Sequence, residues 1–307
     1  MARAKKNVRK DPSFREMKAE YFPVQRQVNL ATTGGGTTYV LDIGRNLSVV
    51  NHRLYRQGKT YQVKIDIDNR ANTDQRPAQY DVYALTDTWY VQKAWQLGRA
   101  NYLKATADER EIMSEQKIAR WEDFRVNAGI SGALAVVPYQ YTSALAGAAN
   151  TDGEFAATEI TLADGTTQRQ YTWGVTSAGE FGLLFEYNKT GDTDGAPNTV
   201  DLDNAYSGTD SGVHESQMDD LAGRGNFPPY NRNDFTDNVW VKVATLDNSG
   251  GANAGFSADA RMSTGFFNAP CGLVVIVPSI SHTLAGDLSM TVKAGKYKGV
   301  AAMNMGA

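Results

Sequence analysis

Apolar and polar residues alternate with a period of two in several parts of the chain, and the pattern is clearest in residues 60–69. There, every second side chain is apolar: Tyr61, Val63, Ile65 and Ile67. This period predicts a β-strand with one buried face and one face in water. Similar short segments predict about ten more strands, at residues 37–50, 78–89, 133–141, 154–163, 169–176, 181–188, 238–246, 261–267, 272–280 and 287–297. The sequence "ADGTT" has the residues of a hairpin turn between two of them.

A helical period occurs only between Thr88 and Arg125. One stripe of a first helix would hold Val91, Trp95, Gly98 and Tyr102. Thr106 followed by Glu109 has capping-box spacing and predicts the start of a second helix. The inner face of that second helix would hold Met113, Lys117, Trp121 and Phe124.

These elements predict an all-β fold, namely a single jelly-roll β-sandwich with a two-helix insertion and long loops. The jelly-roll domain would span residues 27–307, with the helical insertion at about 88–126. A Gly-, Asp- and Asn-rich segment predicts a long loop at about 188–233, and a loop of that length in a compact domain is functional, mobile or part of a subunit contact. No repeat of fixed period was found.

Charge is distributed unevenly along the 307 residues. Residues 1–26 contain eight basic and three acidic residues, a net charge of +5, whereas the whole chain carries −3. The sequence therefore predicts a basic N-terminal arm over residues 1–26 attached to an acidic body. Such an arm suits a polyanion, because Lys and Arg side chains can neutralise phosphates without reading bases.

Seven side chains of this arm are the predicted nucleic-acid-binding residues: Arg3, Lys5, Lys6, Arg9, Lys10, Arg15 and Lys18. Binding by the arm of one molecule is weak, but it becomes strong by avidity when many copies bind the same nucleic acid. The alternatives are a solubilising tail or a nuclear import signal.

Motifs for catalysis or metal binding are scarce in the sequence. The single cysteine, Cys271, excludes an internal disulfide, and the histidines are scattered: His52, His214 and His282. We find no HExxH, CxxC, nucleophile elbow or phosphate loop, so the sequence predicts no enzyme, no cofactor and no metal site. Acids near "GDTDG" leave calcium binding by the long loop open, although EF-hand spacing is absent. No secretory signal is evident, and the longest apolar run, "CGLVVIVP", is too short to span a membrane.

Five aromatic residues have the size and chemistry to stack on bases or sugars: Trp89, Tyr90, Trp95, Trp121 and Trp173. Most of them fall on predicted apolar faces, which favours packing in the core. A carbohydrate-binding jelly-roll module remains an alternative function. A metal-dependent cupin is disfavoured, because cupins need a cluster of histidines.

Two stretches give the chain a family resemblance: "WYVQKAWQLGRANYLKATADEREIMSEQKIARWEDFR" and "DLSMTVKAGKYKGVAAM". With the basic arm, they resemble capsid proteins of small circular single-stranded DNA viruses that encode a replication initiator, especially environmental and marine-animal-associated members. The arm differs from the circovirus pattern, in which it is longer and richer in Arg.

The resemblance implies a structural protein of the virion that assembles with itself, as sixty copies, around circular single-stranded DNA. It also implies passage through the host nucleus during assembly, with a host import receptor and a cell-surface receptor as further partners, and no insertion into membranes. Positive-strand RNA viruses also use jelly-roll capsid proteins with basic arms, so a capsid protein that packages RNA is an alternative hypothesis.

Overall fold

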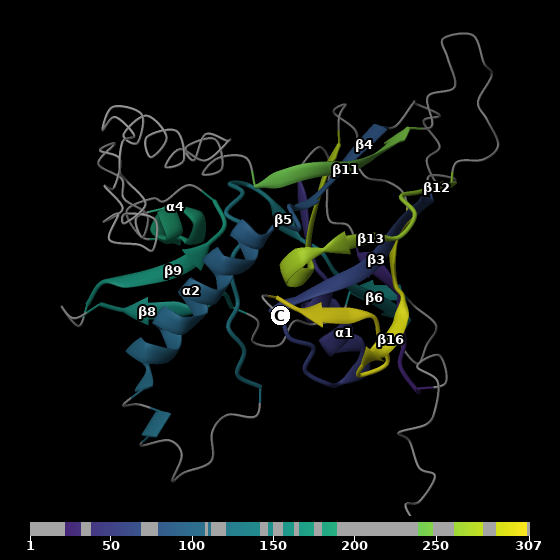
Figure 1. Cartoon of the computed structure of the whole chain (residues 1–307). Coiled ribbons are helices and arrows are strands. Elements are labelled where there is room, and N and C mark those ends of the chain that lie inside the picture. The colour runs from purple at the N-terminus through teal and green to yellow at the C-terminus, as the bar shows by residue number, and fades with distance from the viewer. Residues whose placement is uncertain are drawn as a thin grey trace, which may run out of the picture.

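The computed structural model describes residues 22–31, 38–68, 79–107, 110–111, 121–141, 147–149, 156–162, 166–174, 180–188, 239–247, 261–278 and 287–305. Strands are the commonest element among these residues, and they form curled, mainly antiparallel sheets with few helices between them (Figure 1). The prediction of a mainly β architecture is therefore confirmed. The predicted long loop at about 188–233 lies outside the described residues, except for Asn188.

The first sheet is built around β3, the strand predicted most clearly from its period. Its order is β12 (Arg261–Ser263), β3 (Lys59–Asp68), β15 (Asp287–Val292), β1 (Gln27–Ala31), β6 (Val137–Tyr141) and β7 (Gly147–Ala149). Two short strands, β13 (Phe267–Ala269) and β17 (Ala302–Asn304), also pair with β3. A further strand, β16 (Ala294–Tyr297), leads from β15 toward β17.

The second sheet has the order β11 (Trp240–Asp247), β4 (Gln79–Leu85), β14 (Leu273–Pro278), β2 (Tyr39–Asp42) and β5 (Leu134–Ala135). Apolar side chains from β2, β4 and β14 join those from β1, β3 and β15 in one buried cluster. Burial of this kind is the main stabilising contribution to a β fold without disulfides. The core therefore lies between the two sheets.

The chain between β4 and β11 adds a separate layer. It contains α2 (Trp89–Ala105), α4 (Leu183–Asn188) and a small sheet of order β10 (Glu180–Gly182), β9 (Gln168–Thr172) and β8 (Glu159–Thr161). These elements lie together beside the main sheets (Figure 1) and share a second buried cluster. Its β5 and β6 pair with β2 and β1, so the layer extends both main sheets at one edge.

Helix α2 confirms the first predicted helix, whose N-cap is Thr88. The prediction that the second helix continues to about residue 125 is wrong, because residues 121–126 are not helical. There the backbone bonds outward: the N–H of Arg125 donates to Oγ1 of Thr158 at 2.8 Å, and the N–H of Thr158 donates to the carbonyl of Arg125 at 2.8 Å. These bonds to a distant segment replace the i to i−4 bonds of a helix.

Two other segments predicted as strands are partly helical. Residues 37–50 contain β2 and then α1 (Ile43–Asn51), where the side chain of Asp42 caps the helix by accepting from the N–H of Arg45 at 2.8 Å. Residues 181–188 contain the end of β10 and then α4, whose Leu183 and Leu184 are buried. A short apolar run does not by itself distinguish a strand from a buried helix.

Candidate nucleic-acid interface

The predicted nucleic-acid-binding residues of the arm all lie outside the described residues: Arg3, Lys5, Lys6, Arg9, Lys10, Arg15 and Lys18. Their role stays a prediction. The structure does describe the base of the arm, residues 22–26, which leads into β1. The surroundings of this base therefore indicate where the arm joins the body.

The base of the arm is held between the end of α1 and the turn that follows β16. The N–H of Gln25 donates to Oδ1 of Asn51 at 2.8 Å, and Nδ2 of Asn51 donates back to the carbonyl of Gln25 at 3.0 Å. On the other side, Nε of Arg26 donates to the carbonyl of Gly299 at 2.7 Å. These three bonds fix the point at which the arm meets the folded body.

Five cations surround this point, and we call them the cationic cluster: Arg26, Arg53, Arg56, Lys59 and Lys298. They come from the arm base, the loop between α1 and β3, the first residue of β3 and the turn after β16. The charge on Lys298 is close enough to Arg53, Arg56 and Lys59 to be perturbed by all three. The fold thus gathers positive charge from distant parts of the sequence.

Three tyrosines hold the backbone of the cationic cluster in place. The hydroxyl of Tyr55 donates to the carbonyl of Lys298 at 3.0 Å, and the hydroxyl of Tyr61 donates to the carbonyl of Arg56 at 2.6 Å. The hydroxyl of Tyr297 accepts from the N–H of Arg56 at 3.2 Å. The ring of Tyr297 packs edge to face on Tyr55 and Tyr61, with centroids 6.1 and 6.4 Å apart. The backbone that carries Arg56 and Lys298 is therefore held in place.

The turn that carries Lys298 has an unusual backbone. Lys298 has φ 50° and Gly299 has φ 89°, and positive φ at both central residues is typical of a type I′ hairpin turn. Tyr297 and Val300 form the bridge that closes it. A positive φ suits Gly299 but is uncommon for lysine, and Nζ of Lys298 compensates by donating to the carbonyl of Leu54.

The electrostatics of the cluster favour an anion. Burial lowers the pKa of Lys59 and of Lys298, and the neighbouring Arg56 lowers both further. Asp123 acts in the opposite direction on Lys298 but does not cancel the shift. Among the residues that the structure describes, no carboxylate forms an ion pair with Arg53, Arg56, Lys59 or Lys298. A bound anion would relieve this mutual repulsion.

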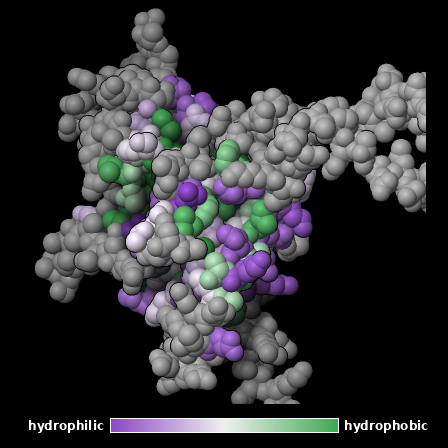
Figure 2. All heavy atoms as spheres, turned by 90° about the vertical axis from the view of Figure 1, so that its left-hand side faces the viewer, coloured by the Kyte–Doolittle hydropathy of each residue, from purple (hydrophilic) through white to green (hydrophobic). Residues whose placement is uncertain are grey.

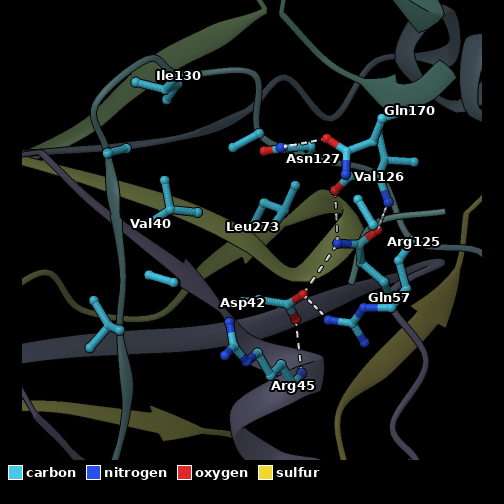
Figure 3. Close-up of a pocket in the computed structure, with 15 residues that line it drawn as sticks. Val40, Asp42, Arg45, Gln57, Arg125, Val126, Asn127, Ile130, Gln170 and Leu273 are labelled. Atoms are coloured by element: carbon cyan, nitrogen blue, oxygen red, sulfur yellow. Dashed lines mark hydrogen bonds and ion pairs between the residues drawn. The ribbon is translucent and has the colours of Figure 1, made fainter. Parts of the chain in front are cut away.

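A second polar group lies beside the cluster, around a cavity of about 210 Å³ (Figure 3). Asp42 caps α1 through one oxygen, and through the other it pairs with Arg125 and accepts from Nε2 of Gln57 at 3.2 Å. The amide of Gln57 also bonds both backbone groups of Val126, at 2.6 and 3.1 Å. Most polar groups on this wall therefore already have partners. The arrangement ties the body to the inserted layer, and the cavity is below the about 300 Å³ expected of a small-molecule site.

Asp123 links this network to the cationic cluster. Burial raises the pKa of the Asp123 carboxyl to about 6, against the opposing effect of the Gln57 N–H, which donates to Oδ2 at 2.8 Å. The cations Arg125 and Arg56 also act against the rise, whereas Asp42 adds to it. Asp123 therefore changes charge near pH 6.

The aromatic residues divide into buried and exposed groups. Tyr90, Trp95 and Trp173 are buried, as predicted. The core prediction is wrong for Trp89 and Trp121, which are 59% and 60% exposed. On the face over α2 and the small sheet, the described apolar side chains are interspersed with hydrophilic ones (Figure 2).

The remaining candidates for chemistry offer little. Cys271 is fully buried, and burial raises the pKa of its thiol, which leaves it unreactive at neutral pH. The described residues contain no group of three or more His, Cys, Asp or Glu able to hold a metal ion. His214, His282 and the acidic loop lie outside them. None of the described helices has the length and apolar character needed to cross a membrane.

Sequence reasoning missed the cationic cluster. The signals were present as two short basic segments with tyrosines, "HRLYRQGK" at 52–59 and "KAGKYKG" at 293–299. Each segment has no more charge than an ordinary solvent-exposed surface. The two segments come together only when the strands of the first sheet pair.

No protein-family model, no curated protein and no solved structure matches this chain.

Proposed function

We propose that this chain is the structural subunit of a small icosahedral virus particle, which assembles with itself and packages single-stranded DNA through its basic arm. Jelly-roll subunits with basic arms build such shells, and the shell encloses a nucleic acid that the arms neutralise. The function is structural rather than catalytic. One observation carries the proposal, namely the order of the strands.

The strand order supports a jelly roll. Numbered along the chain, eight strands pair first with last, second with seventh, third with sixth and fourth with fifth: β1 with β15, β2 with β14, β3 with β12, and β4 with β11. These pairs lie side by side as β1-β15-β3-β12 in one sheet and β2-β14-β4-β11 in the other. This is the order expected when one long antiparallel ribbon folds over on itself into two Greek keys.

Exposed apolar groups support contacts between subunits. Trp89 and Trp121 are large and exposed, and Val241 and Val243 are exposed on β11, which is the last strand of the second sheet among the residues that the structure describes. Aromatic side chains are enriched in the centres of protein interfaces, and a bare strand edge invites pairing. A shell subunit buries such features against its neighbours.

Negative-stain electron microscopy and the ratio of absorbance at 260 and 280 nm test the proposal on purified full-length protein. We expect uniform closed particles that contain nuclease-protected nucleic acid. The variant R3Q/K5Q/K6Q/R9Q/K10Q lacks five positive charges of the arm. It should still form particles but lose the nucleic acid, because fewer counterions are released when the arm binds phosphates.

The control is K93Q/K104Q, which removes two exposed charges from α2 and should package normally. Particles that keep their nucleic acid in the arm variant would contradict packaging by the arm. Protected RNA in place of DNA would overturn the choice of DNA. A protein that never forms particles would overturn the shell itself.

The exposed tryptophans favour a second candidate, a carbohydrate-binding module. Lectin domains also use the jelly roll, and Trp89 and Trp121 are exposed and have indole rings of the kind that stack on sugars. This candidate predicts glycan binding by a monomer or dimer, lost in W89A or W121A, and it predicts no closed particles.

A further inference from the structure

We propose that the cationic cluster is a second nucleic-acid contact, which binds backbone phosphates of the packaged strand where the arm joins the body. The inference rests on the proposed function for its ligand. It assigns the contact to Arg53 and Arg56, with Arg26, Lys59 and Lys298 as supporting charges.

The chemistry of the cluster selects a phosphate chain. Arg53 and Arg56 are exposed on one short loop, and guanidinium groups bind phosphate oxygens in pairs of parallel hydrogen bonds. Lys298 is held on a backbone of positive φ next to them, which is the kind of strained geometry that persists at functional sites. The charges of Arg56 and Lys298 repel one another, so their mutual electrostatics add no stability to the fold.

The aromatic rings at the cluster predict indifference to base sequence. Nζ of Lys59 lies 4.2 Å from the centroid of the Tyr297 ring, and Nζ of Lys298 lies 5.6 Å from it. The same ring packs against Tyr55 and Tyr61. Since these contacts occupy Tyr297, it is not free to stack on bases, and the cluster should read the backbone alone.

The position of the cluster extends the arm. Arg26 belongs to both, and its bond to Gly299 places the arm base against the turn that carries Lys298. A nucleic-acid strand held by the arm therefore meets further positive charge where the arm joins the body. These charges stand on a backbone that the fold holds in place, which reduces the entropy lost on binding.

The test uses full-length R53Q/R56Q and a fluorescent thymidine oligonucleotide, with binding measured by anisotropy between 0.05 and about 1 M salt. Each lost contact to single-stranded DNA reduces the slope of log K against log salt by about 0.7, so the variant should lose about 1.4. At about 0.15 M salt this corresponds to binding about tenfold weaker, with the difference vanishing toward about 1 M.

Two further variants separate charge from folding. The charge-matched control K93Q/K104Q should keep the wild-type slope, and R53K/R56K should restore most of it. If R53Q/R56Q binds like the control while the arm variant R3Q/K5Q/K6Q/R9Q/K10Q loses binding, the inference is wrong and the proposed function stands. If R53K/R56K fails to restore the slope, a phosphate contact by charge is refuted. If wild-type protein binds no oligonucleotide, packaging and the inference both fail.

Discussion

Asp123 offers the sharpest test of the electrostatics around the cationic cluster. Its carboxyl has a pKa of about 6 in the folded protein, against an ordinary value of 3.8, because it is largely buried beside the Gln57 loop. Between about pH 4 and pH 6 the folded state holds a proton that the unfolded chain has released. The free energy of unfolding therefore falls as the pH rises through this window, and the cost is fully present above pH 6.

The substitution Asp123→Asn removes the charge and keeps an oxygen that can accept from the N–H of Gln57. Two pH units correspond to about 3 kcal/mol, which is an upper limit because the carboxyl keeps some contact with water. We expect the variant to match the wild type at pH 4 and to be about 1–3 kcal/mol more stable at pH 7. Urea unfolding of the unassembled protein, followed by tryptophan fluorescence at four pH values, measures the difference.

Asp81→Asn is the matched control with the opposite sign. Burial raises the pKa of Asp81, but hydrogen bonds from Lys242 and Thr245, with the charge on Lys242, outweigh it and lower the pKa below 3.8. The pair lies at the surface, so the variant should lose less than about 1 kcal/mol; this loss is fully present above about pH 4 and disappears as the pH falls through the lowered pKa of Asp81. An Asp123→Asn variant that is no more stable than the wild type at pH 7, with Asp81→Asn behaving as stated, would refute the account of Asp123.

Three substitutions test how the inserted layer is held. Gly174→Ala should cost about 3 kcal/mol of unfolding free energy, because its Cβ would lie 2.5 Å from the carbonyl oxygen of Gly129, a backbone atom that cannot rotate away. Gly58→Ala should cost about 1–3 kcal/mol, since its Cβ would lie 2.2 Å from the Trp95 ring, and a change in the tryptophan emission maximum should accompany it. Asp42→Ala should cost about 3–5 kcal/mol by removing both a helix cap and one side of a buried ion pair. Urea unfolding checks all three, and losses below about 0.5 kcal/mol would contradict the packing described.

The parts of the fold that sequence predicted well are those with a strong local period. In β3 and β4, apolar side chains recur at every second position, which predicts a strand. In α2 they recur every three to four positions, which predicts a helix. Helix α1 was missed because Val49, Val50 and Gly44 are weak helix formers. Its signal was the cap at Asp42 followed by an apolar stripe.

The candidate site depends on long-range pairing, which no local pattern encodes. Arg26 and Lys298 lie near opposite ends of the chain, and β15 must pair with β1 before they meet. The order of the two sheets was likewise beyond the sequence, since alternation predicts that a strand exists but not its neighbour. The basic arm is evident from local composition, whereas the cluster at its base forms only when distant segments pair.

Closed-shell assembly is the claim on which the account depends, and charge-detection mass spectrometry of the purified protein tests it most directly. We expect one dominant species of about 2 MDa, the mass of sixty chains of 33.5 kDa, with additional mass from nucleic acid that the arm variant lacks. A protein that stays monomeric or dimeric at every concentration and salt would contradict the account.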